Sequence, residues 1–359
     1  MKPLLPAFAA RRPGVLAFID LVQDVDVMLP VLIAIRAGGG LRLNVVVSRW
    51  LMRESPRTGA LLSRHGFSFT QAPRRQVVEG RGPSLRGMAA VISAAESSHP
   101  AHTAAHALAR RAKAAGLKTY ALQHGFENVG LFGLEAGTAS FASDVVFCWF
   151  PEGLTPSTLP AQTRGKLAHV GRPASVSLQP PGAGFDVGVF ENLHWDRYTE
   201  SDRHGFLEGL AAAAGALPQT RFLLRTHPAG GWADQFGHEL ARIENITPVR
   251  AGDARSDLQS GAELVWDLGR VITTPSTVAL DAAAAARPVA LATAGGAAYH
   301  PLPVLRTPQD WIEFASGGGG DRRTLDQFIS RVLVAGDGAP RIAARLSRDL
   351  LRLGPDQHE

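Results

Sequence analysis

The chain contains very little cysteine and no long apolar run. Cys148 is the single cysteine among 359 residues, so neither a disulfide within the chain nor a cysteine-rich zinc site can form. The absence of disulfides favours a reducing, cytoplasmic location. The longest apolar run, 25–35, is interrupted by Asp26 and Pro30 and is too short to cross a bilayer. Residues 1–14 lack the long apolar core of a secretory signal, and we expect none.

Lysine is also scarce, and nearly all of the positive charge comes from scattered arginine. Residues 1–180 contain 20 Lys and Arg against 10 Asp and Glu, a formal charge of +10, whereas the remainder has 17 against 22, a charge of −5. The basic half suits peripheral contact with an acidic membrane leaflet, a phosphorylated lipid or an acidic glycan, or it simply reflects an arginine-rich composition. Nucleic acid is not an expected partner, because no binding motif appears and aromatic residues do not alternate with the basic ones.

Short apolar runs alternate with helical patterns, which predicts parallel sheets covered on both faces. The expected strands are 14–19, 43–48, 67–70, 88–93, 118–123, 143–150, 185–190, 221–225, 247–250, 271–272 and 289–292. The expected helices are 24–36, 51–65, 101–115, 202–215, 232–243, 278–286, 323–334 and 340–353.

The segment 151–181 is rich in Pro, Gly, Ser and Thr and predicts a linker between two domains. The fold class is therefore α/β: a Rossmann-like, doubly wound domain at 1–180 faces a second one at 181–359 across a cleft, and the second includes the C-terminal helices. Ligands of such sheets bind beyond the carboxyl ends of the strands.

Polar side chains follow several expected strands, as this topology requires of a site. They are Asp20 and Asp24, the run from Gln123 to Asn128, the run from Glu191 to Trp195, Thr226 to Pro228, and Ser276 with Thr277. The last two residues begin a helix after Thr274 and Pro275. Hydroxyls there either cap the helix or, with its free N–H groups, bind a phosphate. Asp281 lies one turn further on the same face, either bonded to a ribose or solvated.

Two histidines and two carboxylates are candidates for chemistry. His124 is a structural side chain, a general base or a phosphate contact. His227, whose backbone is restricted by Pro228, can donate to a phosphate oxygen. Arg225 either binds the ligand or extends its guanidinium group into solvent. Asp20 or Asp24 can deprotonate an incoming hydroxyl, although Asp24 also suits an N-cap of the following helix.

No metal or nicotinamide cofactor is expected. Asp24 and Asp26 are two apart on a helix and do not face one site. The histidines His99, His102 and His106 are spaced for one helical face, with no carboxylate or cysteine in that pattern, and we expect a polar surface there. Glycines 125, 130 and 133 do not form the GxGxxG of a dinucleotide fold.

Three motifs in order, Gln123-His124-Gly125, Arg225-Thr226-His227-Pro228 and the run from Thr274 to Asp281, resemble those of the CDP-glycerol glycerophosphotransferases and bacterial capsular polysaccharide transferases. That group belongs to the B-type, twin-Rossmann glycosyltransferases (GT-B), which include Kdo- and sialyltransferases. The resemblance implies His124 as a base on the acceptor side. It assigns His227, Ser276 and Thr277 to the donor phosphate and Asp281 to the ribose or sugar. Two features differ from the glycerophosphotransferases: Gln123 stands where they usually have an aromatic residue, and their long amino-terminal extension is not found in this sequence.

The sequence thus predicts a metal-independent glycosyltransferase without a cofactor. Its donor is CMP-, CDP- or UDP-linked, and its acceptor is a cell-surface polysaccharide or a lipid-linked acceptor. The expected location is the cytoplasm, with peripheral contact at the inner face of the membrane. The catalytic residues are His124 and Asp20, and the donor contacts are Arg225, His227, Pro228, Thr274, Ser276, Thr277 and Asp281. Three alternatives stay open: a CDP-glycerol-type transferase, a nucleotide-sugar 2-epimerase and a catalytically silent nucleotide-binding protein.

Overall fold

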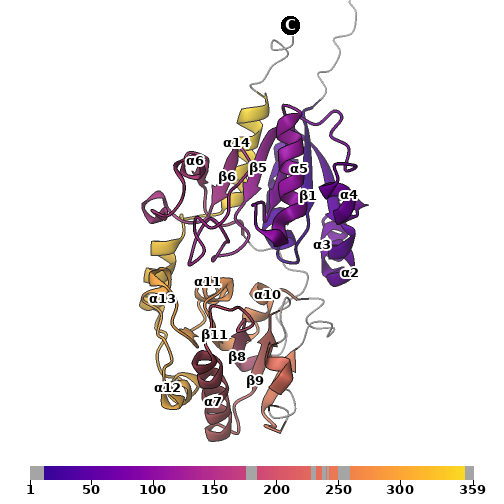
Figure 1. Ribbon diagram of the computed structural model, residues 1–359. Helices are drawn as coiled ribbons and strands as arrows, with labels where there is room; N and C mark the ends of the chain where they lie inside the picture. Colours follow the sequence, from indigo (N-terminus) through magenta and orange to yellow (C-terminus); the bar gives the residue numbers. More distant parts are fainter. Residues whose placement is uncertain are drawn as a thin grey trace, which may run out of the picture.

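The computed structural model describes residues 12–174, 184–227, 232–236, 240, 242–249 and 259–351, and it contains two parallel sheets. The first sheet has seven strands in the order β3-β2-β1-β4-β5-β6-β7, and the second has five in the order β10-β9-β8-β11-β12. In each sheet the chain first adds strands on one side of its first strand in sequence, β1 or β8, and then adds the later strands on the other side, as in doubly wound folds. Figure 1 shows the two sheets one above the other, with helices around each. The predicted α/β fold class is confirmed.

The strands of the first sheet lie where the apolar runs predict them. They are β1 (Gly14–Ile19), β2 (Arg42–Ser48), β3 (Phe69–Ala72), β4 (Ala90–Ala94), β5 (Lys118–Leu122), β6 (Val145–Cys148) and β7 (Leu167–His169). Every residue of β1 is buried, because helices cover both faces of the sheet. The strand β7 was not predicted. It is an edge strand of three half-buried residues within the Pro- and Gly-rich segment, where no apolar run marks it.

The helices of this part are α1 (Asp24–Gly38), α2 (Arg49–Glu54), α3 (Pro56–Arg64), α4 (Arg74–Val78), α5 (Thr103–Ala114) and α6 (Ala161–Arg164). The single helix predicted over 51–65 is wrong, because the chain breaks at Ser55 into α2 and α3. Pro56 lacks an N–H and disfavours helical backbone at the residue before it. Ser55 accordingly has a non-helical ψ of 85°.

The second sheet consists of β8 (Phe185–Glu191), β9 (Phe222–Thr226), β10 (Ile246–Val249), β11 (Leu268–Thr273) and β12 (Val289–Leu291). Its helices are α7 (Glu200–Ala216), α10 (Gly261–Val265), α11 (Thr277–Ala284), α12 (Pro308–Ala315) and α13 (Arg322–Val332). The helix predicted over 232–243 is wrong at its start, because Trp232–Phe236 forms a 3-10 turn.

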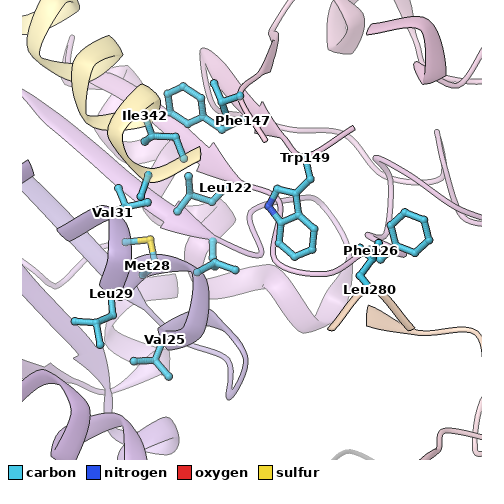
Figure 2. Packing of buried hydrophobic residues seen from close by; sticks show 14 of the residues in the cluster. Val25, Met28, Leu29, Val31, Leu122, Phe126, Phe147, Trp149, Leu280 and Ile342 are labelled. Carbon is cyan, nitrogen blue, oxygen red and sulfur yellow. The ribbon is translucent and has the colours of Figure 1, made fainter. Parts of the chain in front are cut away.

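The helix α14 (Gly338–Leu351) packs against α1 of the first domain, although the predicted boundary at residue 180 groups it with the second. Its Ile342 lies in the same apolar cluster as Val31 and Phe147 (Figure 2). The Tyr120 hydroxyl on β5 donates to an Asp349 carboxylate oxygen at 3.2 Å. The chain thus passes between the sheets twice, once before β8 and once between α13 and α14.

One cluster of buried apolar side chains is continuous across both sheets. It contains Trp149 after β6 and Phe126 after β5, together with Leu280 on α11 (Figure 2). Burial of such side chains stabilises the contact between the domains by roughly 25 cal/mol for each Å² removed from water. No helix among the described residues is long and apolar enough to span a membrane.

Candidate functional site

The loops that follow strands of the first sheet contact the helices and loops that follow strands of the second sheet. The Phe126 N–H after β5 donates to the Thr277 hydroxyl oxygen at the start of α11, over 2.8 Å. A Cβ on Gly125 would lie 3.3 Å from the same oxygen, so the absence of a side chain permits this approach. The structure thereby brings the Gln123-His124-Gly125 and Ser276-Thr277 motifs together, although they are about 150 residues apart in sequence.

Gln123 sets the shape of this loop. Its amide nitrogen donates to the carbonyls of Gly125 at 2.9 Å and of Phe126 at 3.4 Å, and its amide oxygen accepts the Trp149 N–H at 2.8 Å. A buried side chain that satisfies backbone groups on both sides fixes the loop against the end of β6. Gln123 therefore has a structural role in this loop.

His124 lies partly buried on this loop. Its backbone N–H donates to the Asn128 side-chain oxygen at 3.1 Å, while its ring Nδ1 is buried without a hydrogen-bond partner in the described structure. Burial lowers the pKa of His124 to about 4, so the ring is neutral at pH 7. A neutral imidazole with a free nitrogen is able to accept a proton or a hydrogen bond.

Behind His124 lies His102, which is buried and not part of a polar surface as the spacing of the three histidines had suggested. Its ring packs edge-on against the His124 ring with the centroids 5.2 Å apart, and its Nδ1 lies 2.6 Å from the Ser97 hydroxyl. Burial is the main reason that the pKa of His102 falls to about 3. Ala95, directly after β4, has a φ of 49°, a strained conformation that is often found near functional sites.

Glu96 was not predicted as a site residue, because the spacing that groups His99, His102 and His106 on one helical face includes no carboxylate. This buried carboxylate accepts the N–H groups of Ala142 and Ser143 at 3.1 and 3.0 Å and lies 2.6 Å from the His106 Nδ1. These bonds lower its pKa despite burial, so it is charged at neutral pH. Its role in the described structure is to fix the loop before β6.

Asp20 and Asp24 follow β1, and both are buried. One Asp20 oxygen accepts from the Arg74 Nε at 2.6 Å. Asp24 Oδ2 accepts the N–H groups of Asp20 and Leu21 at 3.1 and 2.9 Å, whereas its Oδ1 is buried without a partner. Asp24 is the first residue of α1 and bonds backwards to the preceding loop, so its interpretation as an N-cap is wrong. Burial raises its pKa to about 7.

The start of α11 is capped by Ser276, whose hydroxyl accepts the Val278 N–H at 3.3 Å. Thr274 is buried, and its hydroxyl donates to the Asn192 side-chain oxygen at 2.6 Å. Asp281 forms an ion pair with Arg172 at 2.6 Å. In this arrangement Thr274 stabilises the loop after β8, and the Asp281 carboxylate is paired.

His227 follows β9 and contacts His194, which follows β8. Their ring centroids are 4.9 Å apart and their planes are tilted by 32°. Both ring nitrogens of His194 are buried without a hydrogen-bond partner in the described residues. Burial lowers the pKa of His227 to about 4 and also lowers that of His194. The sequence placed His194 at a strand end but gave it no role. Pro228 lies outside the described residues.

Arg225 is buried at the end of β9 and donates to the Gln259 carbonyl oxygen at 3.1 Å, while its Nη1 has no partner in the described structure. It lies near a buried ion triad across the domains. The Arg57 guanidinium on α3 contacts Asp26 on α1 at 2.6 Å and Glu263 on α10 at 2.8 Å. Asp24 and Asp26 thus have separate partners, as their spacing predicts.

Together these contacts define a two-domain α/β protein with facing strand ends and a helix N-terminus at their junction, and comparisons with known structures agree. A candidate UDP-N-acetylglucosamine 2-epimerase from Listeria monocytogenes matches with a TM-score of 0.65 and 14% identity, over 97% of this chain and 98% of that one. The Neisseria meningitidis UDP-GlcNAc 2-epimerase bound to UDP-GlcNAc matches with a TM-score of 0.63 and 10% identity, over 94% and 100%. The glycotransferase of kitacinnamycin matches with a TM-score of 0.58 and 12% identity, over 94% and 100%.

The chain therefore has the GT-B fold that these structures share. No family model and no curated protein matches the sequence. The narrower resemblance to the CDP-glycerol and capsular transferases, and the predicted roles of the site residues, stay predictions.

Proposed function

We propose that this protein is an enzyme that acts on a nucleotide-activated sugar. The nucleotide binds the second domain beside α11, His194 and His227, and the reacting sugar points toward His124 of the first domain. The observation that carries the proposal is that two imidazoles, His124 and His194, follow strands of different sheets and have buried ring nitrogens without a partner among the described residues. Buried polar atoms without partners are costly, and a polar ligand between the domains satisfies them.

The first reaction to test is 2-epimerisation, because UDP-GlcNAc 2-epimerases recur among the similar structures. Inversion at C2 of a sugar removes a proton from one face and returns one to the other, which requires two acid–base groups. His124 is neutral at pH 7 and suits a base. Asp24, with its pKa near 7 and a free Oδ1, suits an acid at the same edge of the sheet.

Glycosyl transfer is the second candidate, and one observation favours it. Two carboxylates are already in ion pairs: Asp281 of α11 with Arg172, and Glu127, which follows β5, with Arg197. Transfer to an acceptor hydroxyl needs one base, which His124 supplies, and donors for the leaving phosphate, which His227 and the start of α11 supply. The acceptor is then a glycan or a lipid-linked glycan, or, in CDP-glycerol-type transfer, a polyol phosphate chain.

Thermal shift with CMP-, CDP-, UDP- and GDP-linked donors identifies the nucleotide, because a ligand of the folded state raises the melting temperature. The bound donor is then incubated in D₂O without an acceptor. Deuterium at C2 identifies an epimerase, donor consumption only with an added glycan acceptor identifies a transferase, and binding without turnover identifies a silent binding protein. If none of the four donors raises the melting temperature, the proposal is wrong.

Two variants test the assigned roles. We expect His124→Ala to lower turnover by about 10²- to 10⁴-fold, the usual contribution of a general base, with donor binding retained. His227→Ala is expected to weaken donor binding instead. The matched control is His204→Ala, which removes an exposed histidine of α7 that pairs with Glu208. Wild-type turnover in both site variants would contradict the assignment.

A further inference from the structure

The loop that holds His194 is fixed on both sides, so the ring is held in place. Asn192 donates from its side-chain amide to the Pro275 carbonyl at 3.3 Å and accepts from Thr274 at 2.6 Å. Arg197, at the other end of the loop, pairs with Glu127 of the first domain and donates to the Pro275 carbonyl at 3.4 Å. A side chain with two buried and unpartnered nitrogens on a fixed loop is unusual, since most such atoms find partners.

The charged groups that face His194 and His227 oppose protonation of either ring. Arg197 acts on His194 from the β8 loop, and Arg225 acts on His227 from β9. The rings also oppose each other, because two cations at a centroid distance of 4.9 Å repel. Glu127 of the first domain forms an ion pair with Arg197. The imidazole pair, His194 and His227, is therefore neutral at pH 7 in the free protein.

An anion suits this pair better than a metal ion does. A metal site of neutral imidazoles needs further ligands, and no group of three or more metal-binding side chains occurs among the described residues. Oxygens of a phosphate accept N–H bonds, and their negative charge within about 4 to 6 Å raises the pKa of an imidazole. Arg225 supplies a further buried donor in the same strand end.

We propose that His194 and His227 together bind the phosphate oxygens of the nucleotide-linked substrate, and that the pair takes up a proton from water as those oxygens bind. The inference rests on the proposed function and adds a ligand residue, His194, and a proton linkage to it. No covalent bond changes: a solvent proton moves to one imidazole nitrogen, which then donates to a phosphate oxygen. Substrate affinity accordingly increases as the pH falls.

Isothermal titration calorimetry measures the linkage. The probe is UDP-GlcNAc, whose phosphodiester groups do not titrate between pH 5.5 and 8, or whichever of the CMP-, CDP- or GDP-linked donors binds. Titrations at each pH in two buffers with different ionisation enthalpies give the number of protons bound. We expect about 0.5 to 1 proton at pH 6, a value near zero at pH 8, and a Kd about three- to tenfold lower at pH 6.

The variants His194→Gln and His227→Gln locate the proton. Glutamine keeps a hydrogen-bonding group but does not titrate, so we expect either variant to reduce the proton uptake, with weaker binding at pH 6. His204→Gln on the surface of α7 is the matched control and is expected to keep both. If a variant does not fold, the ring C–H shifts of the 12 histidines, followed by NMR in the wild type, report the protonation directly.

The outcomes separate the two proposals. Nucleotide binding without proton uptake at pH 6, or with the same uptake in both glutamine variants, overturns the inference and leaves the proposed function standing. Failure of all four donor classes to bind overturns both.

Discussion

Replacement of Arg57 by methionine tests the contact between the two domains. The Arg57 side chain is 4% exposed, and its guanidinium lies 2.6 Å from Asp26 and 2.8 Å from Glu263. Methionine fills much of the volume but leaves two carboxylates without their cation. Removal of one partner from a buried ion pair costs about 3 to 5 kcal/mol, and because Asp26 is 25% exposed we expect the lower end, about 3 kcal/mol at pH 8.

The loss has a defined pH dependence. Burial already raises the pKa of Asp26 with Arg57 present, and removal of the cation raises it further. An acid with a raised pKa in the folded state destabilises the fold when it is charged and buried, so the loss is full at pH 8. It becomes smaller as the pH falls through the folded pKa and Asp26 takes up a proton.

Urea unfolding followed by circular dichroism measures the free energy, and hydrogen exchange in α10 shows whether the domain contact opens first. Adding Glu263→Gln to Arg57→Met should restore part of the stability, because a neutral amide needs no cation. The matched control, Arg75→Met, removes an exposed ion pair with Glu79 and should leave the unfolding midpoint unchanged. A loss below about 1 kcal/mol at pH 8 would show that solvent or other groups already compensate these carboxylates, contrary to the geometry.

Two further predictions concern single groups. Thr277→Val removes the acceptor of the Phe126 N–H and is expected to cost about 1 to 2 kcal/mol by urea unfolding, whereas Thr138→Val, at an exposed hydroxyl, should cost much less. Asp24 has a pKa of about 7 in the folded state, so wild-type stability falls between about pH 4 and 7, where the group ionises in the unfolded chain but stays protonated in the folded protein. Asp24→Asn lacks this fall, and its melting temperature relative to wild type should therefore rise from pH 5 to pH 8. An unchanged difference would contradict the raised pKa.

Much of the fold could be predicted from the sequence because buried parallel strands are continuous apolar runs. The residues of β1, for example, form one such run and are all buried. Prediction failed where a tertiary contact or a short element decides the structure. The strand β7 has three half-buried residues and no apolar run, and the break before α3 depends on a single proline that tolerates a first helical position.

The candidate site could likewise be predicted only in part. Parallel topology alone predicts that residues after strands meet at one edge, which is why the loop with His124 and the start of α11 could be expected to face each other. The partners could not be predicted, because they depend on three-dimensional distance: Arg57 and Glu263 are 206 residues apart. His194 carried a positional signal, since it follows β8 closely, but its buried nitrogens are visible only in the packed structure.

The position of α14 has a consequence for the order in which the molecule forms on the ribosome. The apolar face of α14, with Ile342, Leu346 and Leu350, packs on the first sheet, although it is synthesised after every strand of the second. The nascent first domain therefore keeps an uncovered apolar surface while about 150 further residues are translated. Its core closes only after the second domain has emerged, so the first part of the chain to be made is the last to be completed.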